Sequence, residues 1–156
     1  TGWNPATKRH ETYNKNNQIE RLTDDSGNFL SYDYNTEGRL ISIKGNSGPK
    51  VAIEYNGQTT NIYSLDGNKK TLVTSYLFNE KNQLQKTSIP VNEQETYEIN
   101  YGYNEASGLL ESIKQYDGTE VTFGYEHDKL TQIVNGVGNK FQFSYEGNET
   151  LLTDLL

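Results

Sequence analysis

The stretch YDYNTEGRLISI, residues 32–43, contains the pattern that the rest of the chain repeats. It begins with an aromatic segment, Tyr32-Asp33-Tyr34, continues through the polar residues 35–38, and returns to apolar residues at Leu40. Tyrosine is enriched in strands, and Asn and Gly tolerate the positive φ angles of tight turns. The stretch therefore predicts a β-hairpin.

The aromatic residue that ends this first segment returns along the chain at intervals of 20 to 25 residues, each time followed by Asn or Glu. The series is Tyr13, Tyr34, Tyr55, Phe78, Tyr103, Tyr125 and Tyr145. Self-similarity at such a period is typical of repeat architectures, in which each repeat is one small supersecondary unit. Each unit here reads as two strands and two turns, with Asp-Gly or Asn-Gly at the second turn.

We expect an all-β fold: a curled antiparallel meander sheet of about six hairpin repeats, with roughly twelve to fourteen strands, open or barrel-like. Residues 1–156 are predicted to form a single domain, possibly a fragment of a longer repeat array. The aromatic and aliphatic residues in register are expected to form the inner face and the core. Pro90, in the longest insertion, is expected in a loop or on an edge.

The second apolar segment of each unit poses a problem, because its two apolar residues are three positions apart. The pairs are Ile19 and Leu22, Leu40 and Ile43, Ile62 and Leu65, Leu110 and Ile113, and Leu130 and Ile133. Such residues point to opposite faces of an ideal strand. A β-bulge would restore a common face, or the first residue of each pair would plug the end of the sheet. A short helix is the remaining alternative.

Composition narrows the function classes. The chain is 32% apolar, with a mean hydropathy of -0.87, yet it has 12 Tyr and 5 Phe, which suits a thin sheet better than a thick globule. The net charge of -7 and the pI of about 4.8 leave no basic stripe for nucleic acid or anionic lipid. Cysteine is absent, which excludes disulfide and thiol chemistry. No apolar run reaches the ~18 residues of a membrane helix.

The stretch 32–43 resembles the YD repeat of the RHS family, whose motif is an aromatic pair around Asp, a turn ending in Gly-Arg-Leu, and an apolar residue three positions further on. Tyr101-Gly102-Tyr103-Asn104 with Leu110 and Ile113 is also similar, and Phe123-Gly124-Tyr125-Glu126 with Leu130 and Ile133 is less so. The unit at Tyr55 lacks the Gly-Arg-Leu turn. The resemblance covers about residues 13–150.

The resemblance implies a spiralling β-sheet of the kind that forms shells around bacterial toxins or scaffolds large surface proteins. It implies a non-catalytic structural or interaction module, extracellular or at the cell surface of a bacterium. The partners would be the rest of the parent chain, other repeats, or a surface glycan. The chain is also similar to small secreted lipoproteins of gut-type Bacteroidota, which would make it a separate domain that binds carbohydrate through exposed aromatics such as Trp3, Tyr63 and Tyr116.

Few residues could take part in catalysis or metal binding, and we predict no enzyme, no cofactor and no metal site. His10 and His127 have no partner motif for zinc. The best calcium candidates are Asp24, Asp25 and Asn28, with Asp66 and Asn68 behind them, but such residues also cap hairpin turns. Glu93 and Glu95 read as solvated loop charges, Gly136-Val137-Gly138 as a turn, and Asn148-Glu149-Thr150 as a chance glycosylation pattern.

The ends of the chain carry two further expectations. The absence of Met, including at position 1, suggests a processed or excised piece. Leu151 follows Tyr145 by six residues, as Leu40 follows Tyr34, so residues 150–156 read as the start of another repeat. Terminal strands with unpaired backbone would promote self-association.

Overall fold

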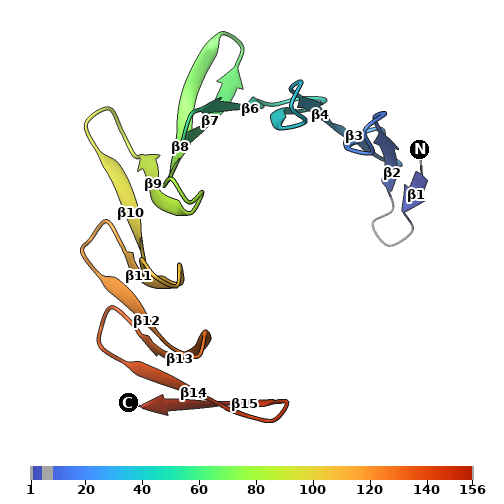
Figure 1. Ribbon diagram of the computed structural model, residues 1–156. Helices are drawn as coiled ribbons and strands as arrows, with labels where there is room; N and C mark the ends of the chain where they lie inside the picture. The colour runs from blue at the N-terminus through green and yellow to red at the C-terminus, as the bar shows by residue number, and fades with distance from the viewer. Residues whose placement is uncertain (1, 5–8, 156) are drawn as a thin grey trace. The chain divides into compact units, whose positions relative to one another are not determined.

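The computed structural model describes residues 2–4 and 9–155, with the side chains of residues 3, 4 and 155 left outside the description (Figure 1). These residues form strands and turns, and no helix occurs among them. Fifteen strands follow one another in the sheet in the order of the sequence, and every recorded register is antiparallel. The predicted all-β meander is confirmed, with one strand more than the predicted range.

The strands are β1 (Gly2–Asn4), β2 (Arg9–Tyr13), β3 (Ile19–Asp24), β4 (Phe29–Tyr34), β5 (Leu40–Gly45), β6 (Lys50–Asn56), β7 (Thr59–Asp66), β8 (Lys69–Phe78), β9 (Leu84–Pro90), β10 (Thr96–Tyr103), β11 (Leu110–Lys114), β12 (Glu120–Glu126), β13 (Lys129–Val134), β14 (Lys140–Glu146) and β15 (Glu149–Leu155). Every even-numbered strand from β2 to β14 contains the repeat aromatic at or near its end, and we call these the aromatic strands. Each is followed by a return strand, and β1 precedes the series.

The chain divides into two compact units, Thr1–Ser75 and Tyr76–Leu156, and the division falls within β8. Each unit is a run of neighbouring hairpins. The single domain therefore stays a prediction.

The turn after an aromatic strand is shaped by an asparagine side chain. Asn35 Oδ1 accepts hydrogen bonds from the backbone N–H of Glu37 at 3.1 Å and of Arg39 at 2.8 Å. The chain reverses at Gly38, which has a φ of 79°. Asn14 and Asn79 form the same turn, with an asparagine at φ 59° in the place of the glycine. The Asn after the repeat aromatic is therefore a turn-forming residue.

Of the alternatives for these apolar pairs, the β-bulge is present in four hairpins. Tyr34 pairs with Leu40 and Asp33 pairs with Ser42, so Ile41 is an extra residue on β5. Leu40 and Ile43 consequently lie on the same face of the sheet as Tyr34 and Tyr32, their partners on the neighbouring strand. The same register shift occurs between β2 and β3, β10 and β11, and β12 and β13.

The prediction fails for Ile62 and Leu65. β6 and β7 pair without a register shift from Asn56↔Thr59 to Lys50↔Leu65, and a two-residue turn joins them. Because this hairpin has no bulge, Ile62 and Leu65 lie on opposite faces. The unit at Tyr55 is one of those without the Gly-Arg-Leu turn, which the sequence has only at residues 38–40.

The expected aromatic core is not formed. Among the described residues no hydrophobic side chain is fully buried, and the two buried side chains are Ser42, 4% exposed, and Thr87, 7% exposed. The repeat aromatics are half-buried or, for Tyr13 and Tyr145, exposed. A single sheet has no second layer against its apolar face, so the side chains on that face keep part of their surface exposed to water.

Two local expectations are corrected. Pro90 is the last residue of β9 and pairs with Thr96, so it ends a strand and does not lie in the loop. Leu151 pairs with Ser144, while Thr150 takes the place opposite Tyr145, and β15 has no bulge. Residues 150–155 therefore do not repeat the pattern of residues 39–44.

No helix in the described part of the chain is long and apolar enough to cross a membrane.

Candidate functional site

The repeated feature with a defined chemistry is the junction between one return strand and the next aromatic strand. β5 pairs with β6 through Ser42↔Ala52 and Ile43↔Val51. Leu40 lies beyond that ladder, beside the bulge. The Tyr55 hydroxyl reaches across and donates a hydrogen bond of 2.9 Å to the Leu40 carbonyl oxygen. The tyrosine thereby satisfies a carbonyl that lies beyond the end of the ladder between β5 and β6.

The same bond recurs at three other junctions. Tyr34 donates to the Ile19 carbonyl at 2.8 Å, Tyr103 to the Leu84 carbonyl at 2.8 Å, and Tyr145 to the Leu130 carbonyl at 2.7 Å. Burial raises the pKa of the Tyr34 and Tyr103 hydroxyls, which keeps them protonated as donors. We call these four contacts the tyrosine ties. They make the hydroxyl group, and not only the ring, part of the repeat.

The residue before each tied carbonyl adds a second contact. Gln18 Nε2 donates to the Gly38 carbonyl at 2.7 Å, and Gln83 Nε2 donates to the Gly108 carbonyl at 2.8 Å. At the corresponding position of other repeats, the Arg39 guanidinium lies 4.6 Å from the centre of the Tyr55 ring and the Lys129 ammonium 5.0 Å from that of Tyr145. Each tie is thus accompanied by a second contact between the same two hairpins, a hydrogen bond in two cases and a cation–π contact in the other two.

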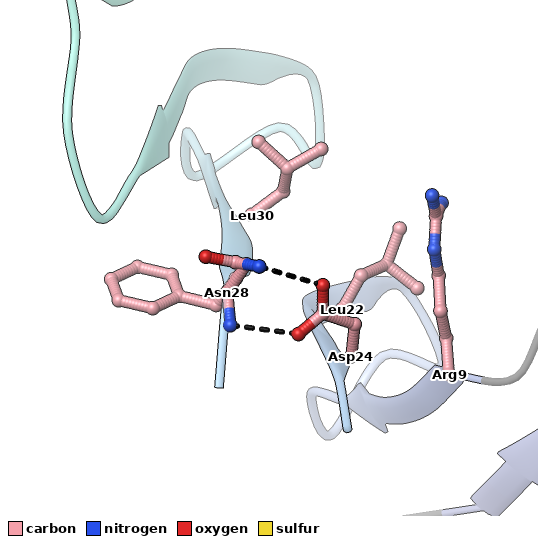
Figure 2. Close-up of a pocket in the computed structure, with 6 residues that line it drawn as sticks. Arg9, Leu22, Asp24, Asn28 and Leu30 are labelled. Carbon is pink, nitrogen blue, oxygen red and sulfur yellow. Dashed lines mark hydrogen bonds between the residues drawn. The ribbon is translucent and has the colours of Figure 1, made fainter. Parts of the chain in front are cut away.

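The strongest calcium candidate is used by its own turn. Figure 2 shows the Asp24 carboxylate directed toward Asn28, with Arg9, Leu22 and Leu30 around a pocket of about 190 Å³ that Phe29 also lines. Oδ1 accepts the N–H of Ser26 and of Asn28, each at 2.9 Å, and Oδ2 accepts the Asn28 Nδ2 at 2.8 Å. These bonds, led by that from the Asn28 side chain, lower the pKa of Asp24.

The other candidate ligands are not brought together. Asp66 ends β7 and Asn68 lies in the turn that follows, His10 lies in β2, and His127 lies in the two-residue turn between β12 and β13. In the part of the chain that the structure describes, no group of three or more His, Cys, Asp or Glu side chains could hold a metal ion.

The carboxylates of the 91–95 loop are also engaged locally. Asn92 Oδ1 accepts the N–H of Gln94 and of Glu95, and Asn92 Nδ2 donates to Glu95 Oε2 at 3.3 Å. Glu93 is exposed. Residues 135–139 form the predicted turn, in which Asn135 Oδ1 accepts the N–H of Val137 and Asn139.

Shallow hollows lie beside the turns of the second unit. One of about 410 Å³ is lined mainly by polar residues and by two aromatics of β12: Asn104, Ser107, Leu109, Glu111, Phe123, Gly124, Tyr125, His127 and Asp128. Asn104 Nδ2 donates to Glu111 Oε1 at 2.8 Å, so this carboxylate is already held. His127 and the two acids Glu111 and Asp128 line this same hollow.

The aromatic platforms expected from the sequence differ from one another. The side chain of Trp3 lies outside the described part of the structure. The Tyr63 ring is covered by the Lys70 ammonium at 4.0 Å. Tyr116 stacks on Tyr97, a contact that the sequence analysis missed. It also missed the tyrosine ties, although three of them join residues 15 positions apart, a spacing that was present in the sequence.

No protein-family model matches the sequence. Similar proteins do exist in Bacillus. The tRNA nuclease WapA of Bacillus subtilis (strain 168) is 28% identical over 132 residues, which cover 80% of this chain. The tRNA3(Ser)-specific nuclease WapA of Bacillus spizizenii is 27% identical over 128 residues, or 77% of this chain. In both cases the chain spans 5% of the length of the relative.

These names correct one prediction. The sequence analysis expected no enzyme, whereas the matched relatives, including the tRNA(Glu)-specific nuclease WapA of Bacillus subtilis subsp. natto, are named as nucleases. The reasoning was based on motifs within this chain, and a segment that spans 5% of a relative does not reveal what the remaining length does.

Proposed function

We propose that this chain is a structural and interaction segment of a large exported bacterial protein, built from repeats of the YD type. Its partners are the neighbouring repeats and the remainder of the parent chain. The proposal draws on the resemblance of residues 32–43 to the YD repeat and on the small share of the Bacillus relatives that the chain spans.

The observation that carries the proposal is the series of tyrosine ties. In each of them, a hydroxyl of one repeat satisfies a carbonyl of the repeat before it, so each of these four hairpins is joined to its neighbour. No hydrophobic side chain among the described residues is fully buried. Such a segment can be extended by further repeats without a larger hydrophobic core, which suits a long scaffold or shell.

The test is the size and location of the parent protein. An antibody against this chain would be used on immunoblots of cytoplasmic, envelope and culture-medium fractions of the source cells, with a strain that lacks the coding sequence as control. We expect a band far above the 17.7 kDa of this chain, in the surface or secreted fraction. A specific band near 17.7 kDa would overturn the proposal and favour a separate small domain.

A further inference from the structure

Tyr97 and Tyr116 form a stacked pair at one edge of the second unit. Their ring centroids are 3.9 Å apart and the ring planes differ by 5°. Among the residues that the structure describes, no other two aromatic rings are stacked. Tyr97 is a half-buried residue of β10, whereas Tyr116 lies in the turn between β11 and β12 and is 58% exposed.

The composition of the chain directs oxidation toward its phenols. Cysteine and methionine are the side chains that oxidants usually attack first, and this chain has neither. It has 12 tyrosines and one tryptophan. An oxidising equivalent that reaches the protein therefore meets tyrosine rings, and the exposed ring of Tyr116 lies against a second tyrosine.

We propose that Tyr97 and Tyr116 are a site of oxidative cross-linking, in which a peroxidase and hydrogen peroxide join the two rings as dityrosine. Each phenol loses one electron and one proton, and the two phenoxyl radicals couple through ring carbons next to their hydroxyl-bearing carbons. One carbon–carbon bond forms, and the two ring hydrogens at those carbons shift to the oxygens. The peroxide takes up the two electrons and two protons and leaves as two water molecules.

The location of the pair allows the coupling step. Stacked rings must tilt before two ring carbons can bond, and Tyr116 has room to do so because it is exposed. Its backbone stays in place, since the Gln115 N–H bonds to the Thr119 carbonyl at 2.8 Å and the Gly118 N–H to the Gln115 carbonyl at 3.0 Å. The tyrosines of the ties differ, because their hydroxyls are held by carbonyl oxygens.

The product would be a covalent staple in a chain without cysteines. It would connect β10 to the turn after β11 and close the loop of residues 97–116. A closed loop restricts the unfolded chain, as a disulfide does.

The test treats the full chain with a haem peroxidase and hydrogen peroxide, followed by digestion with trypsin and mass spectrometry. We expect residues 87–114 and 115–129, which are adjacent tryptic peptides, to be joined with the loss of two hydrogens, and fragment spectra to place the bond at Tyr97 and Tyr116. Mixed unlabelled and nitrogen-15-labelled chains would distinguish a bond within one chain from a bond between two. The same treatment in urea shows that the oxidant can form dityrosine in this sequence.

Matched variants make the outcome decisive. Tyr116→Phe and Tyr97→Phe should each abolish the joined peptide, whereas Tyr101→Phe, in the same peptide as Tyr97, should leave it intact. The inference is overturned if the folded chain forms no such bond while the chain in urea does, if the bond joins other tyrosines, or if it forms only between different chains.

Discussion

A single oxygen atom distinguishes what tyrosine does in this fold from what phenylalanine would do. Most rings of the repeat are half-buried and those of Tyr13 and Tyr145 are exposed, which either residue could achieve. The hydroxyl additionally reaches a carbonyl of the preceding hairpin, at distances between 2.7 and 2.9 Å. A carbonyl that is shielded from water and has no hydrogen-bond donor lowers the stability of the fold. The hydroxyl of each tie therefore adds stability beyond that of the ring contact.

Removing one tie should weaken the protein measurably. We expect Tyr55→Phe to lower the free energy of unfolding by about 1 kcal/mol, because the Leu40 carbonyl loses its donor while the ring stays under Arg39. Urea denaturation would measure it. Tyr63→Phe is the matched control, since the structure shows no hydrogen bond from that hydroxyl; it should change stability by less than about 0.5 kcal/mol. Equal effects of the two variants would contradict the role of the tie.

Asp24 should make stability depend on pH at the acid end. Its pKa is lowered in the folded state, mainly by hydrogen bonds from Asn28, so its contribution is present above the ordinary carboxyl pKa of 3.8 and is lost as the pH falls below it. Asp24→Asn keeps an acceptor for the two backbone bonds and cannot titrate. We expect the wild type to be the more stable form at neutral pH and the difference to disappear below pH 3.8. A constant difference in urea midpoint from neutral to acid pH would refute this.

Among the elements, the turns determine where each hairpin reverses, and the bulges determine which side chains share a face of the sheet. The asparagine after the repeat aromatic closes the turn through its side chain, and a residue with positive φ follows three positions later. The bulge then brings two apolar residues, spaced by three, onto one face. The Leu40 carbonyl lies outside the ladder between the two hairpins and accepts a hydrogen bond from the hydroxyl of Tyr55 in the next repeat.

The turn position of Gly38 offers a graded test. Its φ is 79°, and a Cβ there would make an ordinary contact of 3.4 Å with Gln18 Nε2, so backbone strain and not crowding decides the cost. We expect Gly38→Ala to destabilise the chain by about 1–2 kcal/mol. Gly38→Asn should cost less, because Asn17 and Asn82 occupy the same turn position with φ 59°. Thermal unfolding would rank the variants, and an asparagine variant no better than alanine would contradict the argument.

The sequence was sufficient for the features that have a local cause. Alternation and turn residues predicted the hairpins, and the three-residue spacing of Leu40 and Ile43 left the bulge as one of three alternatives, the one that the structure has. The predictions from sequence were wrong where a structural feature depends on the neighbouring strands. The regular pairing of β6 and β7, the incomplete burial of the aromatics and the stack of Tyr97 on Tyr116 are set by neighbouring strands, which alternation within one strand does not report.

In the whole molecule, we expect stability to come from contacts between neighbouring hairpins, while the terminal strand remains able to pair with another chain. β15 is the last strand of the order, and Leu151 and Leu152 on it are 48% and 63% exposed. Residues 76–156 contain 13 acidic and 5 basic side chains, a net charge of -8, whereas residues 1–75 contain 8 acidic and 9 basic, a net charge of +1. The charge of the second unit opposes association through β15, and salt screens it.

Self-association should therefore rise with both protein and salt concentration. We expect Leu152→Lys to suppress it, because a lysine on an edge strand disfavours pairing with another chain, although the substitution also reduces the negative charge. Sedimentation velocity would measure it. Val137→Lys makes the same charge change in an exposed turn and should have little effect. A monomeric wild type at high salt, or equal effects of both variants, would show that β15 does not associate.

The measurement that tests the central claim most directly is the stability of a lengthened chain. A second copy of residues 126–145 would be inserted after Tyr145, which repeats the 20-residue interval from Tyr125 and supplies one more aromatic strand and the two partners of one more tie. If neighbouring hairpins stabilise one another, the lengthened chain should unfold in urea with a larger free energy and a steeper dependence on denaturant. A lengthened chain that is no more stable, or less stable, than the original would contradict the account.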